Sequence, residues 1–186
     1  MRIIRQRWKG SRLLLNTLAS DFVRYADDEK WIGIPYDRWD CQQFVEEMLR
    51  GVGVRYNWRG SNHMWREAVA DRREKAVASM IPGEWVFTVK NDGGEKARGY
   101  NDDMGNAAHV GIYLGNNRVI HSSAGGVQWG NASDSRWTHS AKCKLLIYDA
   151  ASEKSDLEEL ITKIIKTYKE MEGLIDELVR SYGNSD

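Results

Sequence analysis

The sequence has 186 residues and carries 27 basic and 27 acidic side chains, so its formal net charge is zero. This length suits one compact domain with an appendage, and the balanced charge argues against a protein that binds nucleic acid through a general positive field. No apolar stretch approaches the length of a transmembrane helix, and no apolar signal-peptide core follows the basic start of the chain, so we expect no membrane insertion.

The first half of the chain has the pattern of helices. Residues 12–30 carry apolar side chains at helical spacing. Gly33 and Pro35 then predict a turn, and a second helix is expected from Cys41 to Gly51 or Gly53. Asp40 is its expected N-cap, and a third, shorter helix is expected within residues 60–77.

After Pro82-Gly83 the sequence changes to short runs rich in β-branched and aromatic residues, which predict strands. The four runs are residues 84–89, 108–115, 117–123 and 142–149. Gly115-Asn116-Asn117 predicts a tight hairpin between the middle two, and the long polar loop 90–107 has the length of a functional loop. Helices followed by an antiparallel sheet indicate an α+β fold.

The C-terminal part is different in kind. Residues 151–156 have the composition of a linker, and from Leu157 apolar residues alternate in steps of four and three, which is a heptad seam. Its positions are Leu157, Ile161, Ile164, Tyr168, Met171, Ile175, Leu178 and Tyr182. We therefore divide the chain into a domain at 1–150 and a coiled-coil-like helix at 151–186. Homo-oligomerisation through residues 157–182 is preferred to a helix that packs on its own domain.

Only two cysteines are present, Cys41 and Cys143, and neither has a second cysteine at the spacing of a metal site. Both are expected to be free thiols. Cys41 directly follows the expected N-cap, where the orphan N–H groups and the helix dipole favour a thiolate. A nucleophilic cysteine also needs an imidazole to exchange the proton and a group to orient that imidazole.

His109 and His121 lie on the two strands of the expected hairpin, whereas His63 and His139 lie in loop-like sequence. A two-residue turn at Asn116-Asn117 would pair Gly115 with Arg118, so that the numbers of any two paired residues sum to 233. In this register His109 and His121 lie on opposite faces of the sheet. Contact between the two rings therefore requires a different turn or a bulge in the hairpin.

The segments "WDCQQFV", "PGEWVF" and "AHVGIYLGNNRVIHSS" resemble, in this order, the NlpC-type (NlpC/p-sixty) papain-like peptidases of bacterial cell walls. The resemblance spans roughly residues 31–147 and implies a papain-like fold with N-terminal helices packed on an antiparallel sheet. It assigns Cys41 as nucleophile, His109 as base and His121 as the residue that orients the base. Tyr36 matches a tyrosine that helps to stabilise the oxyanion together with the backbone N–H of Cys41.

The sequence departs from the family pattern beside the nucleophile. Members usually have Asp-Cys-Ser-Gly, whereas this chain has Gln42 and Gln43, and the segment between Tyr36 and Cys41 is shortened. Both changes are expected to line the substrate groove, with Gln42 and Trp39 as substrate-binding residues. Three further tryptophans are interpreted either as groove walls or as core residues: Trp58, Trp65 and Trp129.

The resemblance implies hydrolysis of an amide bond in peptidoglycan stem peptides, between D-glutamate and the following diamino acid, through an acyl-enzyme and without metal or cofactor. An amidase that cuts between sugar and peptide, an acyltransferase, and a non-catalytic wall-binding or virion component remain alternatives. The segments "GSNHMW", "GNAAHVGIY" and "WTH" also resemble cell-wall hydrolases of phages and prophages. A lysin held in the cytoplasm until a holin releases it, or a virion protein, would reach the wall without a signal peptide.

Overall fold

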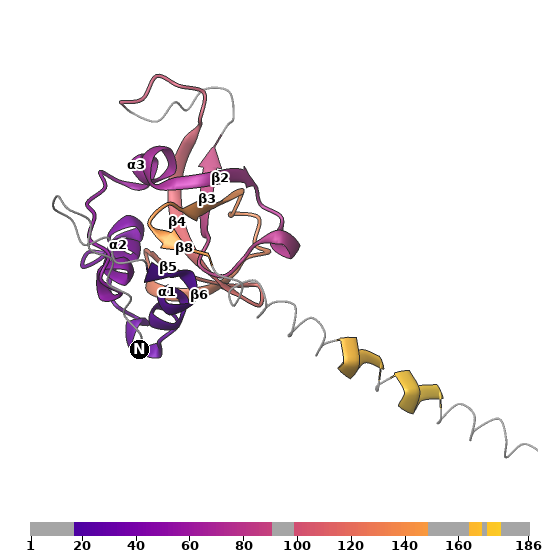
Figure 1. Ribbon diagram of the computed structural model, residues 1–186. Coiled ribbons are helices and arrows are strands. Elements are labelled where there is room, and N and C mark those ends of the chain that lie inside the picture. The colour runs from indigo at the N-terminus through magenta and orange to yellow at the C-terminus, as the bar shows by residue number, and fades with distance from the viewer. Residues whose placement is uncertain (1–16, 91–98, 149–163, 169–170, 176–186) are drawn as a thin grey trace, which may run out of the picture.

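The computed structural model describes residues 17–90, 99–148, 164–168 and 171–175, and the structural statements below concern these residues (Figure 1). The helical elements are α1 (Ala19–Ala26), η1 (Glu29–Trp31), α2 (Cys41–Gly51), α3 (Ser61–His63), the π-helical turn η2 (Met64–Ala68) and η3 (Val77–Ser79). The strands are β1 (Thr17–Leu18), β2 (Val69–Glu74), β3 (Trp85–Lys90), β4 (Asn106–Gly115), β5 (Arg118–Ser123), β6 (Gly126–Asn131), β7 (His139–Cys143) and β8 (Leu146–Ile147).

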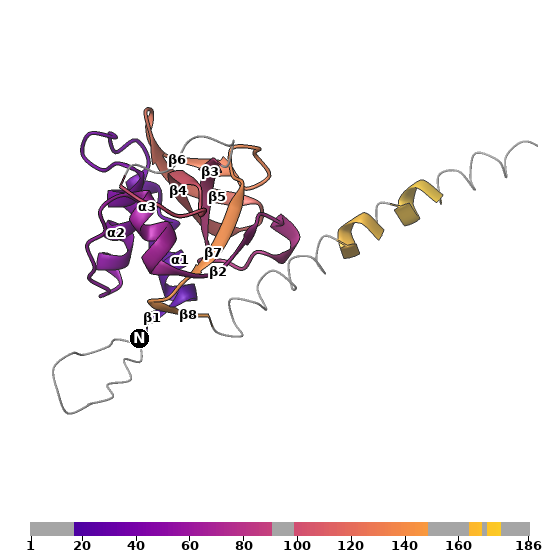
Figure 2. The same ribbon diagram turned by 90° about the horizontal axis from the view of Figure 1, so that it is seen from above.

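Six of the described strands form one antiparallel sheet in the order β2-β7-β3-β4-β5-β6. A second, two-stranded sheet pairs β1 with β8 in parallel and so ties the start of the described domain to its end. In two views α1 and α2 lie on the same side of the large sheet (Figures 1 and 2). The predicted α+β class is therefore confirmed.

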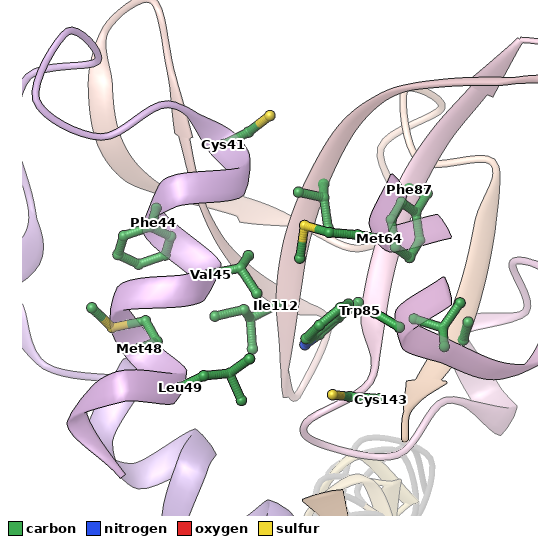
Figure 3. Packing of buried hydrophobic residues seen from close by; sticks show 14 of the residues in the cluster. Cys41, Phe44, Val45, Met48, Leu49, Met64, Trp85, Phe87, Ile112 and Cys143 are labelled. Atoms are coloured by element: carbon green, nitrogen blue, oxygen red, sulfur yellow. The ribbon is translucent and has the colours of Figure 1, made fainter. Parts of the chain in front are cut away.

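Helix α2 packs its apolar face against the centre of the sheet, as its spacing predicts. Phe44, Val45, Met48 and Leu49 are each at most 1% exposed, and Figure 3 shows Val45 and Leu49 beside Ile112 of the sheet, with Phe44 and Met48 on the other side of the helix. Burial of each such side chain contributes about 1.5–3 kcal/mol to folding. This packing holds α2, and with it Cys41 at the helix start, at a fixed position against β4.

The expected third helix over 60–77 is wrong from Val69 onward. Residues Val69–Glu74 form β2, which pairs with β7. Four of the six residues in "VADRRE" are charged, so the segment has only a weak local preference for a strand. It forms a strand because it pairs with β7. The Arg73 guanidinium on this strand donates to both oxygens of the buried Glu84 carboxylate, at 2.6 and 2.7 Å.

Three further boundaries differ from the expectation. The first helix is shorter, since α1 covers Ala19–Ala26, and the part of that prediction before residue 17 lies outside the described residues. The expected strand 142–149 is divided between β7 and β8 by a turn. Strand β6 was not predicted, because "GVQWGN" contains two glycines and no clear alternation.

The C-terminal segment is described only at residues 164–168 and 171–175, both helical. The linker 151–156 and four of the seam positions lie outside the described residues. Side chains of the described part are half to three-fifths exposed, including Ile164, Tyr168, Met171 and Ile175. Both segments lie away from the sheet in the two views (Figures 1 and 2), so packing of these residues on their own domain is not observed.

Candidate active site

The start of α2 is fixed by a reciprocal capping box. The Asp40 carboxylate accepts from the backbone N–H of Gln43 at 2.8 Å, and the Gln43 side-chain oxygen accepts from the backbone N–H of Asp40 at 3.0 Å. A capping side chain of this kind contributes about 1 kcal/mol to stability. Asp40 is thus the N-cap, as predicted, and Gln43 serves the helix start rather than an open groove.

Cys41 occupies the first helical position and is 6% exposed. The backbone N–H groups of Val110 and Gln42 and the hydroxyl of Tyr36 interact with its sulfur and lower the thiol pKa, but burial acts more strongly and raises the pKa above its ordinary value. Burial thus outweighs the expected effect of the helix start, because desolvation disfavours the anion. In this state the thiol is neutral and needs a base.

Strand β4 lies next to the thiol, because the backbone of Val110 interacts with the sulfur, and His109 directly precedes Val110. Asn116 and Asn117 both have positive φ, at 55° and 60°, and form the expected two-residue turn between Gly115 and Arg118. Of the pairs in this hairpin, only Gly115 and Arg118 have the residue numbers expected for strict pairing, which sum to 233. Tyr113 pairs with Val119 and Ile112 with Ile120, so the sum is 232 beyond a bulge at Leu114.

The bulge changes which side chains share a face. In the shifted register His121 lies opposite Gly111, and His109, two residues from Gly111, lies on the same face. The rings meet, with 3.0 Å between His109 Nε2 and His121 Nδ1 and an interplanar angle of 89°. The opposite-face geometry of strict pairing is therefore wrong, and the bulge is the reason.

Gly111 provides the space in which this pair fits. A Cβ at this position would lie 3.1 Å from the Cβ of His121, 2.8 Å from Cγ1 of Val119 and 3.0 Å from the ring of Trp137. All three distances are shorter than ordinary carbon contacts. A residue other than glycine would displace His121 or the packing behind it.

Both histidines are neutral because burial, nearly complete for His121 and partial for His109, shields them from water. Burial is the main cause that lowers the pKa of His109 and of His121 to about 4. The Arg136 cation lowers both pKa values further, and the second histidine contributes for His121, whereas Asp40 and Asp134 oppose the shift. At neutral pH the site thus contains a neutral thiol and two neutral imidazoles.

The low histidine pKa values predict acid destabilisation. The unfolded chain takes up protons on these rings near pH 6.5, whereas the folded chain takes them up only near pH 4. The free energy of unfolding should fall as the pH drops through this window, with a slope of up to about 1.4 kcal/mol per pH unit for each ring. Urea unfolding at a series of pH values, followed by circular dichroism, measures this free energy. The double variant His109→Gln, His121→Asn should have a flatter profile, and parallel profiles would contradict the assignment.

The remaining predicted site residues differ in placement. The Tyr36 phenol is 40% exposed and interacts with both the thiol and the backbone N–H of Cys41, while partial burial raises its pKa. Trp39 is partly buried between Trp31 and Phe44, with ring centroids at 5.9 and 6.4 Å. Gln42 is 8% exposed and its side chain interacts with the Glu46 carboxylate, so it packs in the helix and does not line an open surface.

Of the other tryptophans, Trp58 and Trp65 are core residues at 3% and 4% exposure, so they do not wall a groove, whereas Trp129 is 39% exposed. Sequence reasoning missed Trp137, which contacts both site histidines. It lies in the connection between β6 and β7. No periodic pattern marks it, because it is not part of a strand or helix.

The family model of the NlpC/P60 family matches residues 28–145, which include all of these site residues. The chain belongs to the NlpC/P60 family. No curated protein matches the chain significantly.

The structure is also similar to solved structures of NlpC/P60 proteins. An NlpC/P60 family protein from Bacillus cereus is 19% identical with a TM-score of 0.52, over 72% of this chain and 42% of that one. This chain thus spans less than half of the B. cereus protein, and the likeness concerns the fold. The P60 domain of a Mycobacterium avium subspecies paratuberculosis antigen is 19% identical, with a TM-score of 0.49 over 70% of this chain and 98% of that one. The peptidoglycan hydrolase RipB of Mycobacterium tuberculosis is 21% identical, with a TM-score of 0.47 over 70% and 65%.

Within the described part of this NlpC/P60 chain, no group of three or more His, Cys, Asp or Glu side chains has the geometry to hold a metal ion. Over the same residues, no helix has both the length and the apolar character needed to cross a bilayer.

Proposed function

We propose that this protein is a peptidoglycan hydrolase that acts as a cysteine endopeptidase, with Cys41 as nucleophile, His109 as base and His121 as the orienting residue. The observation that carries the proposal is the imidazole pair, with 3.0 Å between Nε2 and Nδ1, next to a helix-start thiol that interacts with Val110, the residue after His109. Membership of the NlpC/P60 family supports the cell wall as the substrate, as does the name of its structural neighbour RipB, a peptidoglycan hydrolase.

In this proposal each nitrogen of the two imidazoles has one task. His109 Nε2 faces His121 Nδ1, so His109 Nδ1 is the nitrogen that serves the thiol. To accept a proton there, His109 must carry its hydrogen on Nε2 and donate it to Nδ1 of His121. His121 then carries its own hydrogen on Nε2 and accepts through Nδ1.

The reaction begins with neutral partners. The sulfur of Cys41 attacks the carbonyl carbon of the stem peptide while the thiol proton moves to Nδ1 of His109. The carbon–sulfur bond forms and the carbonyl oxygen becomes an oxyanion. The oxyanion collapses, the carbon–nitrogen bond breaks, and the imidazolium returns the proton to the leaving amine.

The acyl-enzyme is then hydrolysed. Water gives a proton to His109 as its oxygen attacks the thioester, and the proton moves to the departing sulfur, which restores the thiol. Tyr36 and the backbone N–H of Cys41 are the proposed oxyanion donors, since the phenol lies against this N–H. Trp39 remains a candidate for the rim of the substrate groove, because it is partly exposed. Gln42, which is buried against Glu46, no longer has a proposed substrate contact.

The proposed bond lies between D-glutamate and the diamino acid of the stem peptide, as resemblance to the family implies. Digestion of purified peptidoglycan followed by mass spectrometry of the released fragments tests it. Fragments that end in D-glutamate support the proposal. Whole stem peptides that begin at the first amino acid would show an amidase, transfer to an added amine an acyltransferase, and retention of the protein on undigested walls a non-catalytic binder.

The cell wall is the proposed place of action, and the phage-like segments make a lysin released through a holin, or a virion protein, the proposed origin. A lysin should clear cells only when a holin opens the membrane, whereas a virion enzyme should co-purify with phage particles.

We also propose that residues 151–186 form a separate helix that assembles the chain into homo-oligomers through the seam 157–182. The exposed seam residues Ile164, Tyr168, Met171 and Ile175 support this, because a soluble helix normally covers such a stripe. A chain truncated after residue 150 should be a monomer that still digests walls, and Ile164→Glu combined with Ile175→Glu should weaken assembly in the full chain. Light scattering measures the mass, and an unchanged mass after truncation would refute the proposal.

A further inference from the structure

Trp137 is buried at 1% exposure and contacts both histidines of the proposed catalytic site. Its ring lies 5.4 Å from that of His109 in a stacked arrangement, with an interplanar angle of 21°. The same ring lies 5.1 Å from that of His121 at an angle of 83°. Since the two imidazoles are themselves 5.1 Å apart at 89°, the three rings form one closed cluster in which each contacts the other two.

The cluster restrains the imidazoles in two complementary ways. The hydrogen bond between Nε2 and Nδ1 determines which nitrogen of His109 remains for the thiol. It does not determine the plane of the His109 ring, because the ring can pivot about this contact. The stacked indole face removes that freedom, since tilting the imidazole would separate the two stacked surfaces.

We propose that Trp137 is the positioning residue of the histidine pair: its indole face sets the plane of His109, and its packing keeps water from the hydrogen bond to His121. This inference rests on the proposed function. Trp137 acts through the histidines and does not touch the reacting atoms.

Gly111 fits the same function. A Cβ there would lie 3.0 Å from the ring of Trp137 and 3.1 Å from the Cβ of His121, so the absence of a side chain lets indole and imidazole meet. The charged groups around the pair are few among the described residues. Arg136 acts on both rings, Asp134 opposes it at His121 and pairs with Arg136 at 3.2 Å, and Asp40 acts from α2. The Arg136 cation lowers the pKa values of the two histidines more than these carboxylates raise them. The protonated imidazoles would therefore need water to stabilise their charge, and the indole excludes water.

A purely structural role is the competing explanation, because Trp137 also belongs to a second apolar cluster with Met80, Val86, Tyr113 and Val119. Met80 is 2% exposed in the same cluster and has no ring that could stack on the imidazoles. Met80→Ala is therefore the matched control: it removes buried volume from the cluster and leaves the three rings in place.

The experiment compares Trp137→Leu, Trp137→Phe and Met80→Ala in the full chain. We expect Trp137→Leu to lower kcat on a soluble stem peptide by about 10- to 100-fold with KM nearly unchanged. The imidazole pKa values, followed by NMR titration, should rise toward the ordinary value as water reaches the rings, and the acidic limb of the pH–rate profile should shift upward with them. Trp137→Phe should recover most of kcat, and Met80→Ala should change neither quantity.

Equal losses of kcat in Trp137→Leu and Met80→Ala, with unshifted histidine pKa values, would overturn the inference. If the Leu variant does not fold, Trp137→Met, which fills more of the space without a ring, provides the same comparison. The titration needs no hydrolysis. A wild-type protein without hydrolytic activity would refute the proposed function, while the imidazole pKa values would still decide whether Trp137 positions the pair.

Discussion

Cys41→Ala is expected to lose wall-digesting activity by at least about 10⁴-fold while the fold is retained. The thiol is the only proposed nucleophile, and its removal leaves no group at the helix start that can form the acyl-enzyme. Alanine is a good helix former, and Asp40 and Gln43 would still cap α2. Release of new amino groups from purified peptidoglycan measures activity, and circular dichroism verifies the fold.

The second cysteine supplies the control. Cys143 is 1% exposed, burial raises its pKa to about 12, and Figure 3 shows it on the far side of the packed core from Cys41. Cys143→Ala should therefore keep its activity and lose only some stability. Iodoacetamide should inactivate the wild type and the Cys143→Ala variant alike. Digestion by Cys41→Ala at the wild-type rate would refute the peptidase proposal.

Removal of the base should have the next largest effect. His109→Ala is expected to lower kcat by at least about 10³-fold, because a buried neutral thiol then has no acceptor for its proton. His121→Ala should cost less, about 10²-fold, since His109 remains but loses the group that selects its tautomer. The double variant should be no slower than His109→Ala, because residues that act as a unit are not additive.

Single-turnover acylation of a chromogenic stem-peptide analogue, measured against pH, distinguishes these variants. His63→Gln is the matched histidine control, since His63 accepts from the backbone N–H of Arg59 and belongs to α3. His121→Asn should retain more activity than His121→Ala, because an amide oxygen can accept from Nε2 of His109. An additive double variant would mean that the two rings act independently and would contradict the assigned pair.

Local sequence was sufficient to predict the start of α2 at Cys41. The capping residue, the apolar spacing of α2 and the position of Cys41 depend on neighbours within a few residues, and each of these predictions is confirmed. The tight turn at Asn116-Asn117 is equally local and also confirmed. The electrostatic state of Cys41 was not predictable in this way, because the burial that raises its pKa results from packing against β4.

The contact between His109 and His121 depends on a bulge that no turn signal reveals. Leu114 is an ordinary strand residue, and only the pairing register shows that it is the extra one. Strand β2 was missed because pairing with β7, some seventy residues later, outweighs the weak preference of "VADRRE". Trp137 was missed for a similar reason, since its contacts with the histidines arise from the β6–β7 connection and not from its own neighbours.

The bulge at Leu114 has a consequence for the tolerance of this hairpin to insertions and deletions. A deletion that removes Leu114 would leave Tyr113 opposite Val119 and Gly111 opposite His121, so His109 and His121 would stay on one face of a hairpin without a bulge. Chain length between the two histidines and the bulge are therefore coupled, and relatives that keep this ring pair should have either the bulge or a hairpin that is one residue shorter without it.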